Sequence, residues 1–225
     1  MSHSEQRTYH VISHTHWDRE WYLSFPHFRR RLVDLIDRLL TLLDTDPNFE
    51  YFHLDGQTIV LEDYLELRPH EAARLQQHIA SGRILIGPWY VQNDEVLTSA
   101  ESTVRNLLRG VRMTKGSDAE PMPIGYVPDQ FGHISQLPQI LRGFGLATAV
   151  MGRGIDMHRR GSAQFVWRGA DGSEVLGLGM PNWYNNAQRF PADPNEAWQV
   201  LQAVVERAAP LEKTTHFLLM NGVDH

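Results

Sequence analysis

The chain has 225 residues, no cysteine and a formal net charge of −6, from 27 acidic and 21 basic residues. This acidic balance argues against a nucleic-acid partner, because duplex-binding proteins usually carry a basic face. No run of about 18 apolar residues predicts a membrane span, and the N-terminus lacks a signal-peptide profile. Without cysteine, disulfides, thiolate metal sites and cysteine nucleophiles are excluded. We therefore expect a cytoplasmic α/β protein with one domain over residues 1–225.

Short β-branched or aromatic runs alternate with segments of helical periodicity, which predicts βα units and a largely parallel sheet. Strands are predicted at Thr8–Ser13, Tyr51–Leu54, Arg83–Ile86, Ile124–Val127, Ala147–Met151 and His216–Met220. Helices are predicted at about 26–43, 58–67, 69–80, 101–113, 135–144 and 195–208. Two further strands, 164–167 and 174–178, flank Asp171-Gly172, a dipeptide typical of a β-hairpin turn.

Polar and aromatic residues follow nearly every predicted strand. In parallel α/β folds the loops at the carboxyl ends of the strands converge on one rim, where active sites lie. The residues that follow the strands are rich in Asp, His, Asn and Trp, as in His14-Thr-His-Trp-Asp18 and Pro128-Asp-Gln-Phe-Gly-His133. This pattern favours an enzyme over an ordinary set of loops.

His14, His16 and Asp18 lie two residues apart at the end of the first predicted strand. Alternate residues of an extended segment project to the same side. Imidazole and carboxylate groups are ligands for Zn²⁺ or another divalent metal. In the alternative interpretation, one histidine packs against the sheet and Asp18 caps the next helix.

Asp129 and Asp224 each follow an apolar strand and are candidates for a catalytic carboxylate pair. Glycoside hydrolysis requires two such groups, one as acid and one as nucleophile or base. Alternatively, Asp129 is a turn residue favoured by the nearby Gly132. Arg153, between two glycines, could neutralise or orient Asp129. Tryptophans and tyrosines after the strands suit a polyhydroxylated sugar, although they could equally pack the rim.

Several motifs together resemble the N-terminal catalytic domain of family-38 glycoside hydrolases, the α-mannosidases, and its bacterial branch most closely. The match runs from about residue 8 to the end of the sequence. The motifs, in family order, are His14-Thr-His-Trp-Asp-Arg-Glu-Trp21, Asp55-Gly-Gln57, Gly87-Pro-Trp-Tyr-Val-Gln-Asn-Asp-Glu95, Pro128-Asp-Gln-Phe-Gly-His133, Met180-Pro-Asn-Trp-Tyr-Asn-Asn186 and Leu218-Leu-Met-Asn-Gly-Val-Asp224.

The resemblance implies a seven-stranded (β/α) barrel and a zinc-assisted retaining mechanism. His16, Asp18 and Asp129 match zinc ligands, and His14 would lie behind them. Asp129 also matches the nucleophile, and Asp224 the general acid/base. We assign four residues to substrate binding, namely Trp21, Arg153, Tyr184 and Asn185. The substrate would be an α-mannoside oligosaccharide or a mannosyl small molecule.

The sequence departs from the family pattern at its C-terminal end. Family members carry a further histidine ligand well downstream of the acid, whereas this sequence ends one residue after Asp224. His225 is the remaining candidate for that ligand, although it adjoins the acid. We therefore expect a C-terminally truncated barrel without the downstream helical and β-sandwich domains. As a fragment, it should retain zinc weakly and have little activity.

Two other functions are compatible with the sequence. A metal-dependent amidohydrolase or deacetylase also carries His-x-His at a first strand, and it would use a metal-activated water. A truncated, inactive carbohydrate-binding remnant would need no catalysis at all. A homo-oligomer is compatible with each of these functions.

Overall fold

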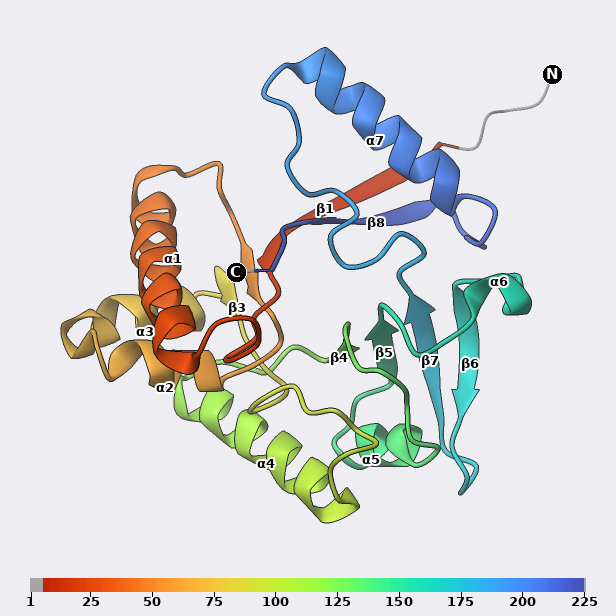
Figure 1. Cartoon of the computed structure of the whole chain (residues 1–225), viewed down its shortest axis with the longest axis horizontal. Helices are drawn as coiled ribbons and strands as arrows, with labels where there is room; N and C mark the ends of the chain where they lie inside the picture. The colour runs from red at the N-terminus through yellow and green to blue at the C-terminus, as the bar shows by residue number, and fades with distance from the viewer. Residues whose placement is uncertain (1–5, 225) are drawn as a thin grey trace. The chain divides into compact units, whose positions relative to one another are not determined.

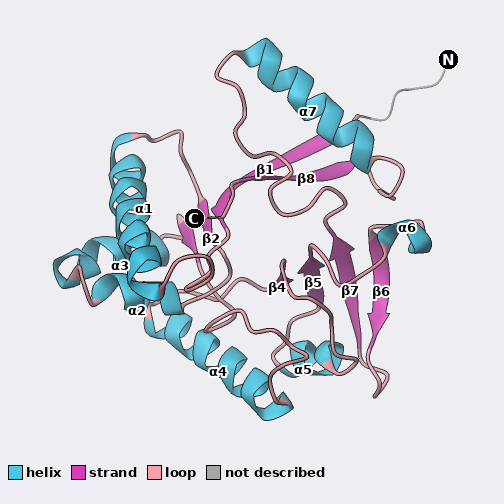
Figure 2. Ribbon diagram, in the orientation of Figure 1, coloured by secondary structure: helices cyan, strands magenta, loops and turns pink. Residues whose placement is uncertain are grey.

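The computed structural model describes residues 6–224, which fold into alternating strands and helices (Figures 1 and 2). The strands are β1 (Thr8–Thr15), β2 (Phe52–Leu54), β3 (Ile84–Leu85), β4 (Gly125–Val127), β5 (Thr148–Met151), β6 (Gln164–Arg168), β7 (Glu174–Gly179) and β8 (His216–Asn221). The helices are α1 (Phe25–Thr45), α2 (Ile59–Leu65), the 3₁₀ helix η1 (Pro69–Glu71), α3 (Ala72–Ala80), α4 (Ala100–Gly116), α5 (Leu137–Gly143), α6 (Met157–Arg160) and α7 (Pro194–Ala208).

The chain divides into two compact units. The His16 unit contains residues 13–92, 100–122 and 223–224. The Asp129 unit contains residues 6–12, 93–99 and 123–222. Strand β1 contributes residues to both of them.

The described strands form two four-stranded sheets, ordered β3-β2-β1-β8 and β4-β5-β7-β6. Strands β1, β2 and β3 pair in parallel, as do β4, β5 and β7. Strand β6 runs antiparallel to β7, as the hairpin signal at Asp171-Gly172 predicts. The predicted parallel character of the fold is thus confirmed, whereas strand pairing does not confirm the closed seven-stranded barrel.

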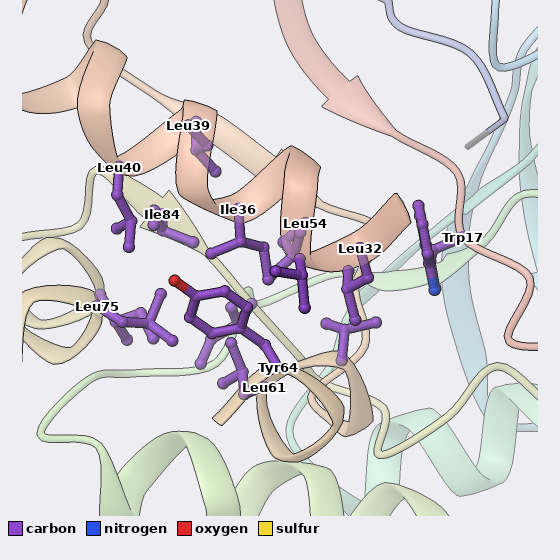
Figure 3. Packing of buried hydrophobic residues seen from close by; sticks show 14 of the residues in the cluster. Trp17, Leu32, Ile36, Leu39, Leu40, Leu54, Leu61, Tyr64, Leu75 and Ile84 are labelled. Carbon is purple, nitrogen blue, oxygen red and sulfur yellow. The ribbon is translucent and has the colours of Figure 1, made fainter. Parts of the chain in front are cut away.

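The core of the His16 unit is built around helix α1, which packs against α2 and α3. The inward face of α1 carries Leu32, Ile36 and Leu40 at spacings of four residues, as an amphipathic helix requires. Figure 3 shows these side chains around the Tyr64 ring, with Trp17 at the end of the cluster. Because Trp17 lies between His16 and Asp18, this core anchors the segment that carries both residues.

The Asp129 unit has its own apolar cluster, in which α7 packs on residues of β8. Val204 and Val205 of α7 meet Phe217 and Leu219 of β8, and Tyr9 of β1 packs against them. The α7 helix begins after Asp193, whose side chain accepts hydrogen bonds from the backbone N–H groups of Asn195 and Glu196. The Asp193-Pro194 pair therefore marks the start of this helix.

Most of the predicted elements are confirmed to within about three residues. Helix α6 was not predicted, because four residues are too few to display a period. Its start depends on Asp156, whose side chain accepts a hydrogen bond from the Arg159 N–H. Among residues 6–224, no helix is both long and apolar enough to cross a membrane.

Candidate active site

His16 and Asp18 come together at the end of β1, as their spacing predicts. The His16 Nε2 atom lies 3.6 Å from the Asp18 carboxylate, and the imidazole is almost fully buried. The backbone N–H of His16 also donates to the Val223 carbonyl, and His16 and Asp224 form a parallel β-bridge. Asp224, the predicted general acid/base, thus lies beside His16 in an isolated bridge beyond the named strands.

Asp55 lies behind His16 and is fully buried. One of its carboxylate oxygens is 3.2 Å from the His16 Nδ1 atom. The other accepts hydrogen bonds from the Trp17 N–H and the Gln57 side-chain amide, both at 2.8 Å. Since an ionised carboxylate only accepts, Nδ1 carries a proton, and Nε2 is the ring nitrogen on the side of Asp18.

The position of Asp55 requires an unusual backbone conformation. Asp55 has a φ of 52° and Gly56 a φ of 65°, both in the left-handed region. The Gln92 side chain donates to the Asp55 carbonyl, and the Gln92 N–H donates to the Gln57 side chain. The Asp55-Gly-Gln57 motif thus forms a turn that holds a buried carboxylate against His16.

The contacts of His16 and Asp55 shift the pKa values of these two side chains in opposite directions. Burial lowers the pKa of His16, but the charges and hydrogen bonds of Asp55 and Asp18 outweigh it and raise this pKa well above its usual value. Burial raises the pKa of Asp55, but His16 and the Trp17 N–H outweigh it, so that this pKa lies below its usual value. A metal ion on Nε2 would compete with the second imidazole proton.

His14 is buried two residues before His16, in the same unit. It is the strand partner of His53 of β2, and the two ring centroids lie 6.3 Å apart. Burial lowers the pKa of His53 to about 4, so that its ring is neutral near neutral pH. A place for His14 behind the predicted ligands agrees with this burial, although its role stays a prediction.

Trp21 lies in the loop between β1 and α1 and is 65% exposed. Its ring contacts Tyr22 edge-on at a centroid distance of 5.0 Å. An exposed aromatic face can stack on a sugar, and its assignment to substrate binding stays a prediction. His225, the other candidate ligand, lies outside the described residues.

In the Asp129 unit, Asp129 follows β4 and is held by Arg153, which follows β5. The Arg153 Nη2 atom lies 2.9 Å from the Asp129 Oδ1 atom, and Arg153 Nε donates to the Asp129 carbonyl at 2.9 Å. The neighbouring Gly152 N–H donates to the Pro128 carbonyl. Arg153 thus contacts Asp129 through one ion pair and one hydrogen bond, and its role in orienting the carboxylate stays a prediction.

Aromatic rings flank the Arg153 guanidinium. The Phe131 ring centroid is 3.9 Å and the Trp183 ring centroid 5.4 Å from its central carbon. Trp183 adopts a φ of 74°, which a bulky residue rarely does. Tyr184 is buried and its ring centroid lies 5.2 Å from that of Trp183, whereas Asn185 is half-exposed and accepts a hydrogen bond from the Gln188 N–H.

Sequence reasoning missed the role of two buried residues in this unit, Glu95 and His133. Both belong to quoted motifs, but they are separated by 38 positions and no sequence signal pairs them. The His133 Nδ1 atom lies 2.9 Å from the Glu95 carboxylate, and its Nε2 atom lies 2.9 Å from the Arg153 carbonyl oxygen. Through Arg153 they adjoin the predicted nucleophile.

The predicted zinc ligands are distributed over both units, with His16 and Asp18 in one and Asp129 in the other. Over residues 6–224, no group of three or more His, Asp or Glu side chains is arranged to hold a metal ion. The chemistry of the donors in the His16 unit nevertheless fits zinc, because an imidazole backed by a carboxylate is a common metal ligand. In addition, the buried Asp224 Oδ1 has no hydrogen-bond partner among the described residues.

The chain is similar to known proteins in both sequence and structure. The sequence model of the glycosyl hydrolases family 38 N-terminal domain matches residues 6–225. The structure superposes on the crystal structure of an α-mannosidase from Enterococcus faecalis V583 with a TM-score of 0.92 and 37% identity, over 98% of this chain and 25% of that one. The protein is an α/β protein, and it belongs to glycosyl hydrolase family 38.

Two curated proteins are similar to this chain in sequence. One, named "Putative mannosylglycerate hydrolase", from Halalkalibacterium halodurans, is 44% identical over 98% of this chain and 26% of its own length. Another, α-mannosidase G of Dictyostelium discoideum, is 27% identical over 78% of this chain and 16% of its own length. The chain thus spans about a quarter of the length of the first relative.

Proposed function

We propose that the protein hydrolyses terminal α-mannosidic bonds by a retaining mechanism. The observation that supports it best is Asp129, which follows β4: its carboxylate forms an ion pair with Arg153, and its backbone carbonyl accepts a hydrogen bond from the same side chain. A nucleophile must be oriented before it attacks, and a fixed carboxylate satisfies that requirement. The seven-stranded barrel of the family is part of this proposal.

In this mechanism Asp129 attacks the anomeric carbon and forms a glycosyl-enzyme intermediate. Asp224 protonates the leaving oxygen and then removes a proton from the water that releases the sugar. Arg153 lies against Asp129 and orients its carboxylate. The Trp183 and Trp21 rings would stack on the apolar faces of the substrate.

His16, Asp18 and Asp129 would hold a zinc ion, and the Asp55 carboxylate would orient the His16 ring toward it. Bound zinc supplies a Lewis acid that positions the sugar hydroxyl groups and stabilises charge in the transition state. The His16–Asp18 approach and the carboxylate behind His16 support the first two of these ligands, and Asp129 joins them through the motif resemblance alone.

The substrate would be an α-mannoside, either an oligosaccharide or a mannosyl small molecule. The relative named for mannosylglycerate makes that compound a natural test substrate alongside an aryl α-mannoside. In the full-length protein, purified with zinc, we expect mannose to be released from at least one of them.

Trapping tests the reaction type. A 2-deoxy-2-fluoro mannosyl fluoride should leave a covalent adduct on Asp129, identified by mass spectrometry of the digested protein. Asp129→Asn should form no adduct, whereas Asp171→Asn, in the exposed β6–β7 turn, should react like wild type. Release of no mannose from any α-mannoside, or cleavage of an amide-linked substrate without an adduct, would refute the proposal.

A further inference from the structure

Glu95 and His133 form a buried ion-paired cluster in the Asp129 unit that the proposed mechanism does not use. Their side chains are 1% and 4% exposed, respectively. One Glu95 carboxylate oxygen lies 2.9 Å from the His133 Nδ1 atom, and the other accepts a hydrogen bond from the Ile134 N–H at 3.0 Å. The carboxylate therefore fixes both the ring of His133 and the backbone that follows it.

The other side of the His133 ring holds the backbone of Arg153. The His133 Nε2 atom lies 2.9 Å from the Arg153 carbonyl oxygen. A carbonyl oxygen only accepts hydrogen bonds, so Nε2 carries a proton. The side chain of the same Arg153 then contacts Asp129 twice. The contacts run without a break from Glu95 through His133 and Arg153 to Asp129.

Close packing leaves the His133 ring little freedom. A Cβ atom built on Gly154 would lie 2.7 Å from two atoms of the ring, closer than real Cβ contacts allow. The Trp167 ring meets His133 edge-on, at a centroid distance of 5.4 Å. Gly154 also has a φ of +79°, so the residue after Arg153 requires glycine for its conformation as well.

We propose that Glu95 and His133 are positioning residues, which pin the Arg153 backbone so that its guanidinium holds the Asp129 carboxylate in the orientation for attack. This inference rests on the proposed function, since it takes Asp129 as the nucleophile. The approach of His133 to Arg153 is independent of that function and can be tested by itself.

The charge state of His133 agrees with this role. Burial lowers the pKa of His133, but the hydrogen bond and charge of Glu95 and the Arg153 carbonyl outweigh it, so the pKa lies above its usual value. Because the pKa of His133 is raised in the folded state, the charged ring stabilises the fold fully below the unfolded-state pKa of about 6.5. This stabilisation is lost as pH rises through the folded-state pKa. Glu95 is the ionisable group that hydrogen-bonds the ring, and Trp167 presents an uncharged edge.

Kinetics of variants in the full-length protein test the proposal. His133→Ala and Glu95→Ala should lower kcat on an aryl α-mannoside on the order of tenfold to a hundredfold, because small misplacements of a reacting group are costly. KM should stay within about threefold of wild type, because the substitutions disturb the chemical step and not substrate binding. A control, His216→Gln, changes another hydrogen-bonded histidine of this unit and should leave kcat unchanged.

Glu95→Gln separates positioning from simple loss of a buried group. The glutamine oxygen can accept from the Ile134 N–H while its amide donates to Nδ1 of a neutral His133, so both contacts persist. We expect Glu95→Gln to keep kcat within about threefold of wild type. A loss as large as that of Glu95→Ala would overturn the proposal.

Gly154→Ala offers a second route if His133→Ala does not fold. Gly145→Ala is its matched control, because Gly145 has a φ of +78° and nothing within 4 Å of a built Cβ. Both variants carry backbone strain, but only Gly154→Ala displaces His133. We expect kcat to fall in Gly154→Ala and to remain near wild type in Gly145→Ala, and equal values would contradict the inference.

Hydrogen–deuterium exchange gives a readout that needs no activity. Peptides covering residues 152–155 should exchange faster in His133→Ala than in wild type and His216→Gln. In wild type their protection, corrected for the intrinsic rate, should fall as pH rises through the pKa of His133. Unchanged exchange in His133→Ala would refute the positioning role even if mannose is released. If no mannose is released but exchange responds as expected, the proposed function is refuted, whereas the positioning of the Arg153 backbone by His133 is confirmed.

Discussion

Asp55 illustrates how one buried carboxylate organises the residues predicted to bind metal. It contacts the imidazole of His16, the backbone of Trp17 and the side chain of Gln57, so each of its oxygens is used. A buried charge is tolerated only when it is paired and hydrogen-bonded in this way. The orientation of the His16 Nε2 atom is therefore fixed before any ligand arrives.

We expect Asp55→Asn to weaken zinc binding about 10- to 100-fold, the usual effect of removing the carboxylate behind a metal-bound histidine. An amide can present its N–H to Nδ1 and so favour the wrong tautomer of His16. The dissociation constant should be measured by competition with a zinc chelator of known affinity.

The control for this measurement is Asp44→Asn. Asp44 pairs with His78 at 2.7 Å in the same unit, but at the surface between α1 and α3. Its substitution should leave zinc affinity unchanged. Equal affinities for Asp55→Asn and the wild type would mean that Asp55 does not orient His16 toward a metal.

At the residue scale, sequence reasoning found the residues that are close along the chain. The two-residue spacing of His16 and Asp18 predicted that they would meet, and the Gly-Arg-Gly segment suggested an arginine near Asp129. The contact of Glu95 with His133 was not predictable, because it joins two loops and depends on how each loop turns. A loop contact leaves no periodic pattern in the sequence.

Among the elements, helix α4 fixes the loop that follows β3. Asn106 of α4 exchanges side-chain hydrogen bonds with the backbone of Val91, and the Arg109 guanidinium lies 3.8 Å from the Tyr90 ring centroid. Gly110 allows this approach, because a Cβ at that position would lie 2.2 Å from the Pro88 carbonyl oxygen. The loop carries Gln92, which bonds to Asp55 and Gln57.

We expect Gly110→Ala to destabilise the protein by about 1–3 kcal/mol or more, because the added methyl group overlaps rigid backbone. Helix propensity alone would predict the opposite sign, a gain of up to about 1 kcal/mol. Gly116→Ala should lose no stability through steric overlap, because nothing lies within 4 Å of a Cβ built at Gly116. Urea unfolding of both variants checks this, and equal free energies of unfolding would contradict it.

Element prediction from sequence succeeded where a buried face repeats. The leucines and isoleucines of α1 and the alternation of strands with helices predicted the elements of the His16 unit. How the strands join into sheets was less predictable, since β1 to β3 and β4 to β7 pair in two separate groups. Pairing depends on which strands bury their faces together, and sequence order does not determine it.

At the scale of the whole molecule, the proposed zinc site links stability to metal. A ligand that binds only the folded state at a hundred times its dissociation constant stabilises it by about 3 kcal/mol. We therefore expect EDTA to lower the Tm of the zinc-loaded, full-length protein and added zinc to restore it.

Asp18→Asn provides the comparison for this measurement, because it removes one proposed ligand. Its Tm should respond to EDTA much less than that of the wild type. A wild-type Tm that EDTA and zinc leave unchanged would count against a metal site that stabilises the fold. The family assignment would be unaffected, since it rests on the match over residues 6–225.

At position 183 the backbone conformation and the side-chain contact favour different residues. Protein engineering at this position would therefore face two conflicting requirements. Trp183 adopts a φ of 74°, which suits glycine or asparagine, whereas its ring flanks the Arg153 guanidinium. A library selected for thermostability alone should enrich glycine at position 183, while selection for turnover should retain the aromatic ring. Optimising this position for one property would therefore move the protein away from the other.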